Sequence, residues 1–223
     1  VRVIGETCPQ YLVLTADDLD RPGFEGAKLV CSPPPRSEKD QEAVWAGLES
    51  GVLQTCHSDH AGYRFDDPDG KKLNGDDAPF NRIPNGVPGL ETRLPILFSE
   101  GVRKGRITLR RFVEISASNP ARLFGIYPAK GVIAVGSDAD IVIWDETMRT
   151  TVSIDTLHDN MDYTPYEGMQ LEGCPVTTIS RGEIVWHDGR PCGVPGSGRL
   201  LRRGAPQTAE FHTRQETPQN GEG

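Results

Sequence analysis

The stretch GVLQTCHSDHA, Gly51–Ala61, is a short apolar run that ends abruptly in His57, Ser58, Asp59 and His60. A buried strand that carries a carboxylate between two imidazoles to its C-terminal end is a usual way for an α/β barrel to present metal ligands or a proton-transfer group. One carboxylate cannot form a metal site alone. The stretch therefore predicts a barrel strand with a candidate site, centred on Asp59, at its end.

The segments before this stretch predict a strand, a helix and a second strand in that order. Ala27–Cys31 (AKLVC) has the composition of a strand, and Pro33 stops it because proline cannot donate to a ladder. Ser37–Ser50 predicts a helix capped by Ser37, with acidic residues in its first turn. Val52–Cys56 follows as the next strand. This order is that of the parallel βαβ unit.

Beyond the candidate site, the chain continues as a long polar loop and then as helices. Ala61–Gly89 is rich in Gly, Asp, Asn and Pro, and a loop of this length is uncommon unless it is functional. Its acidic centre predicts a solvated surface without the spacing of a calcium loop. Glu91–Arg103 and Thr108–Leu123 have helical patterns, and Pro120 is expected to break the second.

The pattern changes to β-structure after Pro128. Val132–Val135 and Ala139–Trp144 flank a Gly-Ser-Asp turn, and Val176–Ser180 and Glu183–His187 flank an Arg-Gly turn, so two hairpins are predicted. We therefore expect an α/β fold, with the C-terminal part of a (β/α)8 TIM-like barrel followed by a small β-sandwich domain.

Three segments follow from these patterns. The barrel part is predicted to cover residues 1–127, the β-sandwich domain residues 128–192, and an extended or mobile C-terminal tail residues 193–223. The tail has too few apolar side chains to offset the entropy of ordering it. We expect its last part, 204–223, to be mobile or to lie along a partner subunit.

Composition excludes several classes of partner and location. The net charge of −8 argues against nucleic acid and anionic membranes, which need a basic surface. No apolar stretch approaches the roughly 18 residues that span a bilayer. The five cysteines are an odd number without a CxxC pair, which is typical of a reducing compartment. We expect a cytoplasmic protein that acts on a small molecule.

Eight strings of the sequence together resemble the dihydropyrimidinase and hydantoinase branch of the cyclic amidohydrolases, in that family's order. They are ETCPQYL (Glu6–Leu12), LVCSPP (Leu29–Pro34), SDHA (Ser58–Ala61), PNGVPGLETR (Pro84–Arg93), NPARLFG (Asn119–Gly125), GSDADIVIWD (Gly136–Asp145), DYTPYEG (Asp162–Gly168) and VTTISRGEIVW (Val176–Trp186). They extend over nearly the whole chain except the tail.

The resemblance implies a zinc-dependent hydrolase that opens the ring amide of dihydropyrimidines or 5-substituted hydantoins, with two zinc ions (Zn2+) per active site. It implies that Asp59 binds one metal and is catalytic, since it accepts a proton from the metal-bound hydroxide. It implies that Ser32 and Asn85 bind substrate through main-chain groups. Family members are commonly homotetramers, so a homo-oligomer is expected.

The same resemblance implies that the other metal ligands, an HxH pair, a carboxylated lysine and two further histidines, belong upstream of Val1. The chain begins without Met in what reads as the middle of a domain. We therefore expect a fragment that is inactive alone. Gly62 replaces a proline that often follows the strand-end string, which leaves the path of the next loop open.

Each site residue also has a plainer interpretation. From spacing alone, Asp59 is equally well a loop carboxylate or a helix cap, Ser32 a strand-end residue and Asn85 a turn former. His57 and His60 are expected to pack or to support the metal ligand from behind, rather than to bind metal themselves. Tyrosine hydroxyls of the DYTPYEG string are expected to anchor a buried loop.

Two other functions remain open at this point. Allantoinase and dihydroorotase relatives would share the barrel and the metals but act on another ring. A dihydropyrimidinase-related interaction protein would keep the fold without catalysis. The residues upstream of Val1 and the substrates that are turned over would separate these alternatives.

Overall fold

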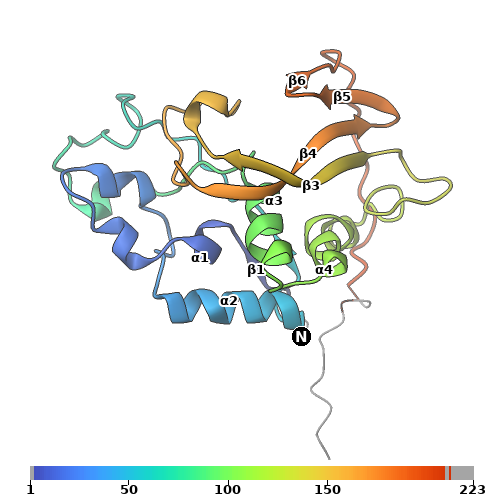
Figure 1. The fold of residues 1–223 in the computed structure, drawn as a ribbon, viewed down its shortest axis with the longest axis horizontal. Coiled ribbons are helices and arrows are strands. Elements are labelled where there is room, and N and C mark those ends of the chain that lie inside the picture. The colour runs from blue at the N-terminus through green and yellow to red at the C-terminus, as the bar shows by residue number, and fades with distance from the viewer. Residues whose placement is uncertain (1–2, 209–210, 212–223) are drawn as a thin grey trace, which may run out of the picture.

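The computed structural model describes residues 3–208 and 211 of the chain (Figure 1). Two short parallel strands lie side by side in it, and the first of them is close to the N-terminus in the sequence. Strand β1 (Glu6–Thr7) pairs in parallel with β2 (Thr55–Cys56), with Thr7 opposite Cys56. The helix between them makes this a βαβ arrangement, with β1 in place of the predicted first strand. Both strands are much shorter than the predicted run of residues 52–56.

Helix α2 (Glu38–Ser50) connects the two strands and matches the prediction closely. Its N-terminus is capped because the Ser37 hydroxyl accepts the backbone N–H of Asp40, while the Asp40 carboxylate accepts the N–H of Ser37 at 3.1 Å. Gly51 ends the helix with φ of 88°, which a glycine adopts without steric cost. Trp45 and Leu48 are the buried residues of its inner face.

The predicted strand at Ala27–Cys31 is wrong. Helix α1 (Gln10–Val13) is followed by two 3₁₀ helices, Ala16–Leu19 and Glu25–Leu29, and the second takes up most of the predicted strand. Burial still alternates along 27–31, as in a strand, but no strand of the described residues pairs with this segment. The strand that pairs with β2 is β1, which lies earlier in the chain.

The two predicted helices after the long loop are present. A short 3₁₀ helix, Phe80–Arg82, interrupts the loop. Arg93–Ile96 (α3) continues as π-helical turns through Leu97–Arg103. The second helical run consists of α4 (Leu109–Val113), π-helical turns over Glu114–Ser118 and α5 (Asn119–Leu123).

Pro120 does not break the second run, contrary to the prediction. It stands in the first turn of α5, directly after the π-helical turns. The missing N–H of proline is tolerated in a first turn.

Four antiparallel strands form the C-terminal sheet in the order β3-β4-β5-β6. Their bounds, with a 3₁₀ helix after the first, are β3 (Ile141–Thr151), Ile154–Thr156, β4 (Gln170–Ser180), β5 (Glu183–His187) and β6 (Arg190–Pro191). Arg181 and Gly182 join β4 to β5 with φ of 49° and 86°. Positive φ at both positions is typical of a type I′ turn, so this predicted hairpin is confirmed.

The other predicted hairpin, with strands at Val132–Val135 and Ala139–Trp144, is wrong. The Gly-Ser-Asp turn directs the chain back toward residue 129, since Asp138 N–H donates to the Ala129 carbonyl at 2.9 Å. Strand β3 pairs with β4 instead. The described residues form one four-stranded sheet here, so the predicted two-sheet sandwich is not observed among them.

The sheet packs directly on the helices. Trp144 of β3 lies against Phe98 and Phe112, with ring centroids 4.8 and 5.7 Å apart. Figure 1 shows β3 and β4 crossing over α3 and α4, so helices and sheet share one hydrophobic core.

The described part of the tail runs along the helical side without forming a helix or strand. Gly204 N–H donates to the Gly125 carbonyl at 2.8 Å, and Gln207 N–H donates to the Arg122 carbonyl at 2.9 Å. Residues 209–210 and 212–223 of the predicted mobile segment lie outside the described residues. Among the helices that are described, none has the length and hydropathy needed to cross a bilayer.

Candidate active site

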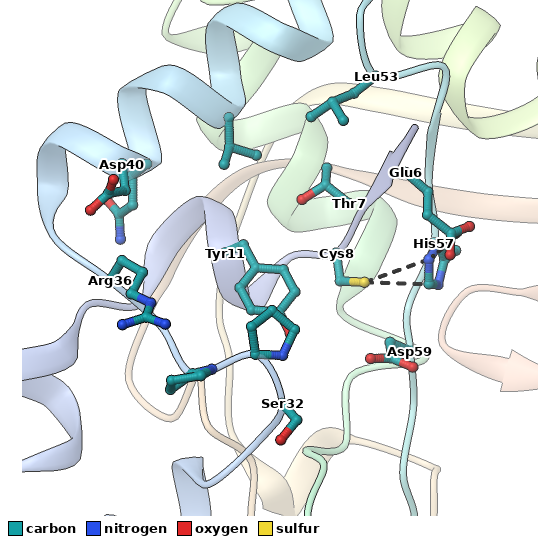
Figure 2. Close-up of a pocket in the computed structure, with 14 residues that line it drawn as sticks. Glu6, Thr7, Cys8, Tyr11, Ser32, Arg36, Asp40, Leu53, His57 and Asp59 are labelled. Atoms are coloured by element: carbon teal, nitrogen blue, oxygen red, sulfur yellow. Dashed lines mark hydrogen bonds and ion pairs between the residues drawn. The ribbon is translucent and has the colours of Figure 1, made fainter. Parts of the chain in front are cut away.

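A pocket of about 580 Å³ opens beside the C-terminal ends of the two parallel strands (Figure 2). Cys8, just after β1, and His57, just after β2, form one side of it, while Ser32 belongs to another. Because parallel strands end at the same edge, residues 49 positions apart in the sequence meet here. The position of the pocket is the one expected of a site in an α/β fold.

Asp59 lies in this pocket on the segment that follows β2. Its backbone has φ of 48°, a left-handed conformation that is uncommon for a residue other than glycine. The side chain is exposed, and no hydrogen bond or ion pair with another described residue occupies its carboxylate. Figure 2 shows it between His57 and Ser32 at the pocket edge. A carboxylate held at a strand end without a protein partner is available to a ligand.

His57 lies among polar neighbours of β1. Its Nε2 is 3.2 Å from the Glu6 carboxylate, and its ring nitrogens are 3.6 and 3.8 Å from the Cys8 sulfur. Burial raises the pKa of the Cys8 thiol, and the nearby Asp59 charge raises it further, so Cys8 is a neutral thiol. These contacts hold His57 at the start of the segment that carries Asp59.

His60 fixes the other side of the same segment. Its Nδ1 accepts the backbone N–H of Gly89 at 3.2 Å, and the N–H of Ala61 donates to the Val87 carbonyl at 3.0 Å. His57 and His60 therefore attach the Asp59 turn at both ends. Packing residues make contacts of this kind, and the roles of the two imidazoles stay a prediction.

Ser32 and Asn85 come together although 53 positions separate them. The Ser32 hydroxyl donates to the Asn85 side-chain oxygen at 3.3 Å, and both residues are exposed. Ser32 lines the pocket of Asp59 and also a second pocket of about 550 Å³, which Asn85 lines as well. Ser32 thus connects the two pockets.

Two side chains that were not singled out from the sequence, one partly buried and one buried, hold carbonyl groups in β2 and directly before it. Arg93 donates to the Cys56 carbonyl at 2.9 Å, and Asn119 donates to the Gln54 carbonyl at 2.8 Å. Burial lowers the pKa of Arg93. Arg93 ends one of the eight strings that resemble the family and Asn119 begins another, and this is the sequence signal by which both could have been found.

A third residue that was not predicted is Lys71 in the long loop. Its side chain is fully buried, and its ammonium donates to three backbone carbonyls near Ser32 and Asn85. Burial lowers the pKa of Lys71 to about 8. The sequence offered no signal for this contact, because Lys71 stands in a stretch of charged residues that reads as solvated.

The residues present could contribute one ligand to a metal site. Among the described residues, no group of three His, Cys, Asp or Glu side chains has an arrangement that could hold a metal ion. Asp59 fits as a single oxygen ligand, since its carboxylate has no other described partner. A complete site would need ligands beyond the described residues.

Comparison with known proteins places the chain in a family. Residues 9–185 match the amidohydrolase family, so the chain belongs to that family. This membership and the structural likenesses below imply a fold of the TIM-barrel type, as predicted.

Two relatives and one solved structure show which members of the family the chain resembles. The chain is 47% identical over 203 residues to a D-hydantoinase of Rhizobium radiobacter, covering 91% of this chain and 43% of the relative. It is 50% identical over 203 residues to a D-hydantoinase of Geobacillus stearothermophilus, covering 91% of this chain and 42% of the relative. Among solved structures, the dihydropyrimidinase from Brevibacillus agri NCHU1002 matches with a TM-score of 0.85 and 50% identity, over 90% of this chain and 43% of that chain. The predicted resemblance to hydantoinases and dihydropyrimidinases is therefore confirmed. The chain spans about two fifths of the length of these relatives.

Proposed function

We propose that this chain is part of a metal-dependent hydrolase that opens the cyclic amide of dihydropyrimidines or 5-substituted hydantoins. The observation that carries the proposal is the carboxylate of Asp59, which has no partner among the described residues and lies at the strand end in the same pocket as Ser32. The names of the relatives, D-hydantoinase and dihydropyrimidinase, support this substrate class.

Amide hydrolysis at neutral pH needs an activated water and a group that transfers its proton. Two zinc ions, when bound, would supply a water of lowered pKa and would polarise the substrate carbonyl. Asp59 would be one ligand, and the remaining ligands would come from polypeptide that precedes this chain. The Asp59 carboxylate accepts the proton of the water and delivers it to the leaving ring nitrogen.

Ser32 and Asn85 orient the ring in this proposal. Their main-chain N–H and C=O groups can pair with the complementary C=O and N–H of a cyclic amide, which fixes which bond faces Asp59. The hydrogen bond between their side chains supports this role, since it keeps the two segments at a fixed spacing.

The direct test is the substitution Asp59→Ala in the full-length protein, assayed for ring opening of dihydrouracil and 5-phenylhydantoin. We expect a fall in kcat of at least about a hundredfold, because general acid–base catalysis alone contributes on that scale. Asp77→Ala, an exposed carboxylate of the long loop, is the matched control and should leave kcat unchanged. Undiminished turnover by Asp59→Ala would overturn the proposal.

The same assay separates the alternatives. Turnover confined to dihydroorotate or allantoin would replace the substrate class while keeping the chemistry. Absence of turnover on all four rings, together with absence of bound metal in the full-length protein, would instead favour a non-catalytic interaction protein.

We also propose a cytoplasmic homotetramer. All five cysteines lie within the described residues and none is in a disulfide, which supports a reducing compartment. The size of the native assembly in solution tests the tetramer.

A further inference from the structure

Lys71 is an unusual residue for its surroundings. It stands in the polar loop of residues 61–89, beside the acidic and exposed Asp66 and Asp69, yet its own exposed fraction is 0%. Burying an ammonium is costly unless its N–H groups are all hydrogen-bonded. Lys71 is buried in spite of this cost, whereas the next residue, Lys72, forms an ion pair with Asp66 on the loop surface.

The ammonium of Lys71 has three acceptors, one for each N–H group. The Nζ atom lies 2.9 Å from the carbonyl oxygen of Val30, 2.7 Å from that of Pro84 and 2.6 Å from that of Gly86. Lysine has three donors and no acceptor, so its hydrogen-bonding capacity is used completely. No carboxylate of the described residues takes part, so within them the ammonium binds backbone only.

These three carbonyls flank the two candidate substrate-binding residues. Val30 lies two positions before Ser32, and Pro84 and Gly86 are the neighbours of Asn85 on either side. The N–H of Gly86 also donates to the Val30 carbonyl at 3.0 Å. One ammonium therefore joins the backbones of two segments that are 53 positions apart, at the point where the Ser32 hydroxyl meets the Asn85 side chain.

The loop itself is held so that Lys71 reaches this point. The N–H of Lys71 donates to the Arg64 carbonyl at 2.8 Å. A Cβ at the preceding Gly70 would lie 2.0 Å from the same carbonyl oxygen, so only glycine fits there. The N–H groups of Phe65 and Asp66 are bound by the Asp162 carboxylate.

We propose that Lys71 is a positioning residue that sets the spacing of the Ser32 and Asn85 main-chain groups and thereby the affinity for the cyclic amide. The inference rests on the proposed function, since it assumes that these two segments bind substrate. Lys71 does not touch the substrate. It acts through the three carbonyls: the Pro84 carbonyl shares its peptide group with the N–H of Asn85, and the Val30 and Gly86 carbonyls lie in the same two segments as Ser32 and Asn85.

The test is the substitution Lys71→Met in the full-length protein, which replaces the side chain by an unbranched apolar one that lacks only the terminal position and removes all three donors. We expect KM for the cyclic amide to rise at least about tenfold while kcat changes less than threefold, because binding rather than proton transfer is affected. Lys72→Met is the matched control and should leave both constants unchanged. A lysine that only stabilises the fold would lower the melting temperature without moving KM of the folded enzyme, and that result would overturn the proposal.

A second measurement does not depend on activity. Amide hydrogen exchange of segments 30–32 and 84–86 should accelerate at least about tenfold in Lys71→Met and not in Lys72→Met. If the unsubstituted protein opens no cyclic amide, the proposed function fails, and exchange still decides whether Lys71 holds the two segments. Unchanged exchange would refute the positioning role whatever the activity. If Lys71→Met does not fold, Lys71→Gln, which keeps two N–H donors, is measured instead, with a smaller shift of the same sign expected.

Discussion

The carboxylate of Asp162 accepts the backbone N–H of Phe65 at 2.7 Å, although 97 positions separate the two residues. Its second oxygen accepts the N–H of Asp66 at 2.9 Å. In the DYTPYEG string it is therefore the Asp162 carboxylate that holds the long loop. The buried Tyr163 hydroxyl has no hydrogen-bond partner among the described residues. The expectation of a tyrosine anchor is wrong for Tyr163.

Asp162 should make the protein sensitive to acid. Burial acts to raise the pKa of Asp162, but the N–H groups of Asp66 and Phe65 and the Arg64 guanidinium hold it below its ordinary value. The stabilisation is therefore present above the ordinary pKa of about 4 and is lost as pH falls through the lower folded value. Asp162→Asn should cost about 1–3 kcal/mol at pH 7, since the amide can accept only one of the two N–H groups.

Urea unfolding of the wild type and Asp162→Asn at a series of pH values checks this prediction. The difference in free energy of unfolding should shrink as pH falls below about 4. Asp77→Asn, in the same loop, serves as the control with a difference near zero. A difference that stays constant down to pH 2 would contradict the assignment.

Gly173 and Gly182 provide a matched pair on strand β4 and its turn. Both have positive φ, 95° and 86°, but a Cβ at Gly173 would lie 2.3 Å from the Phe98 ring, whereas at Gly182 it would meet nothing within 4 Å. Gly182→Ala should cost about 1 kcal/mol for the backbone alone. Gly173→Ala should cost about 1–3 kcal/mol more, because the ring must move in a packed core. Thermal unfolding of both variants measures the difference, and equal losses would show that Phe98 does not press on this strand.

Removal of the Ser32 hydroxyl should have a small effect on catalysis. If main-chain groups hold the substrate, Ser32→Ala loses only the exposed hydrogen bond to Asn85, so KM should rise about two- to fivefold with kcat unchanged. Ser50→Ala, at the end of α2, is the control. Steady-state kinetics of the full-length protein decides the point, and a loss of kcat above a hundredfold would assign the hydroxyl itself to the chemistry.

The 223-residue chain on its own should hold no stoichiometric zinc and open no cyclic amide. The described residues supply one candidate ligand, Asp59, and no cluster of three donors. Metal analysis of the purified chain after dialysis should give far less than one zinc per molecule. Two tightly bound ions would contradict the proposed division of ligands between this chain and the preceding polypeptide.

The parts of the fold that could be predicted are those specified by neighbouring residues. Helix α2 is set by the Ser37 cap and its own apolar face, and the β4–β5 hairpin by the conformations of Arg181 and Gly182. The failures at Ala27–Cys31 and Val132–Val135 have a different cause. Both segments have strand composition, but a strand also needs a partner, and pairing is decided by distant residues.

In the candidate site, too, some residues could be predicted from their neighbours in the sequence and others depend on distant contacts. The strand-end position of Asp59 follows from the local pattern, and the resemblance to the family indicated Ser32 and Asn85. Lys71 could not be found in this way, because its importance lies in three carbonyls that only the folded chain brings within reach. Charged residues in a loop read as solvated unless their tertiary contacts are known.

The packing of Trp144 on Phe98 and Phe112 also bears on where the molecule can be divided. The sequence pattern changes at residue 128, but Trp144, which follows this boundary, packs into the hydrophobic core of the helices that precede it. A protein truncated there would present two aromatic rings to water, and an isolated sheet would do the same with its tryptophan. Expression of either half by itself should therefore yield poorly folded, aggregation-prone protein. Chimaeras with a relative should exchange the helices and the sheet together.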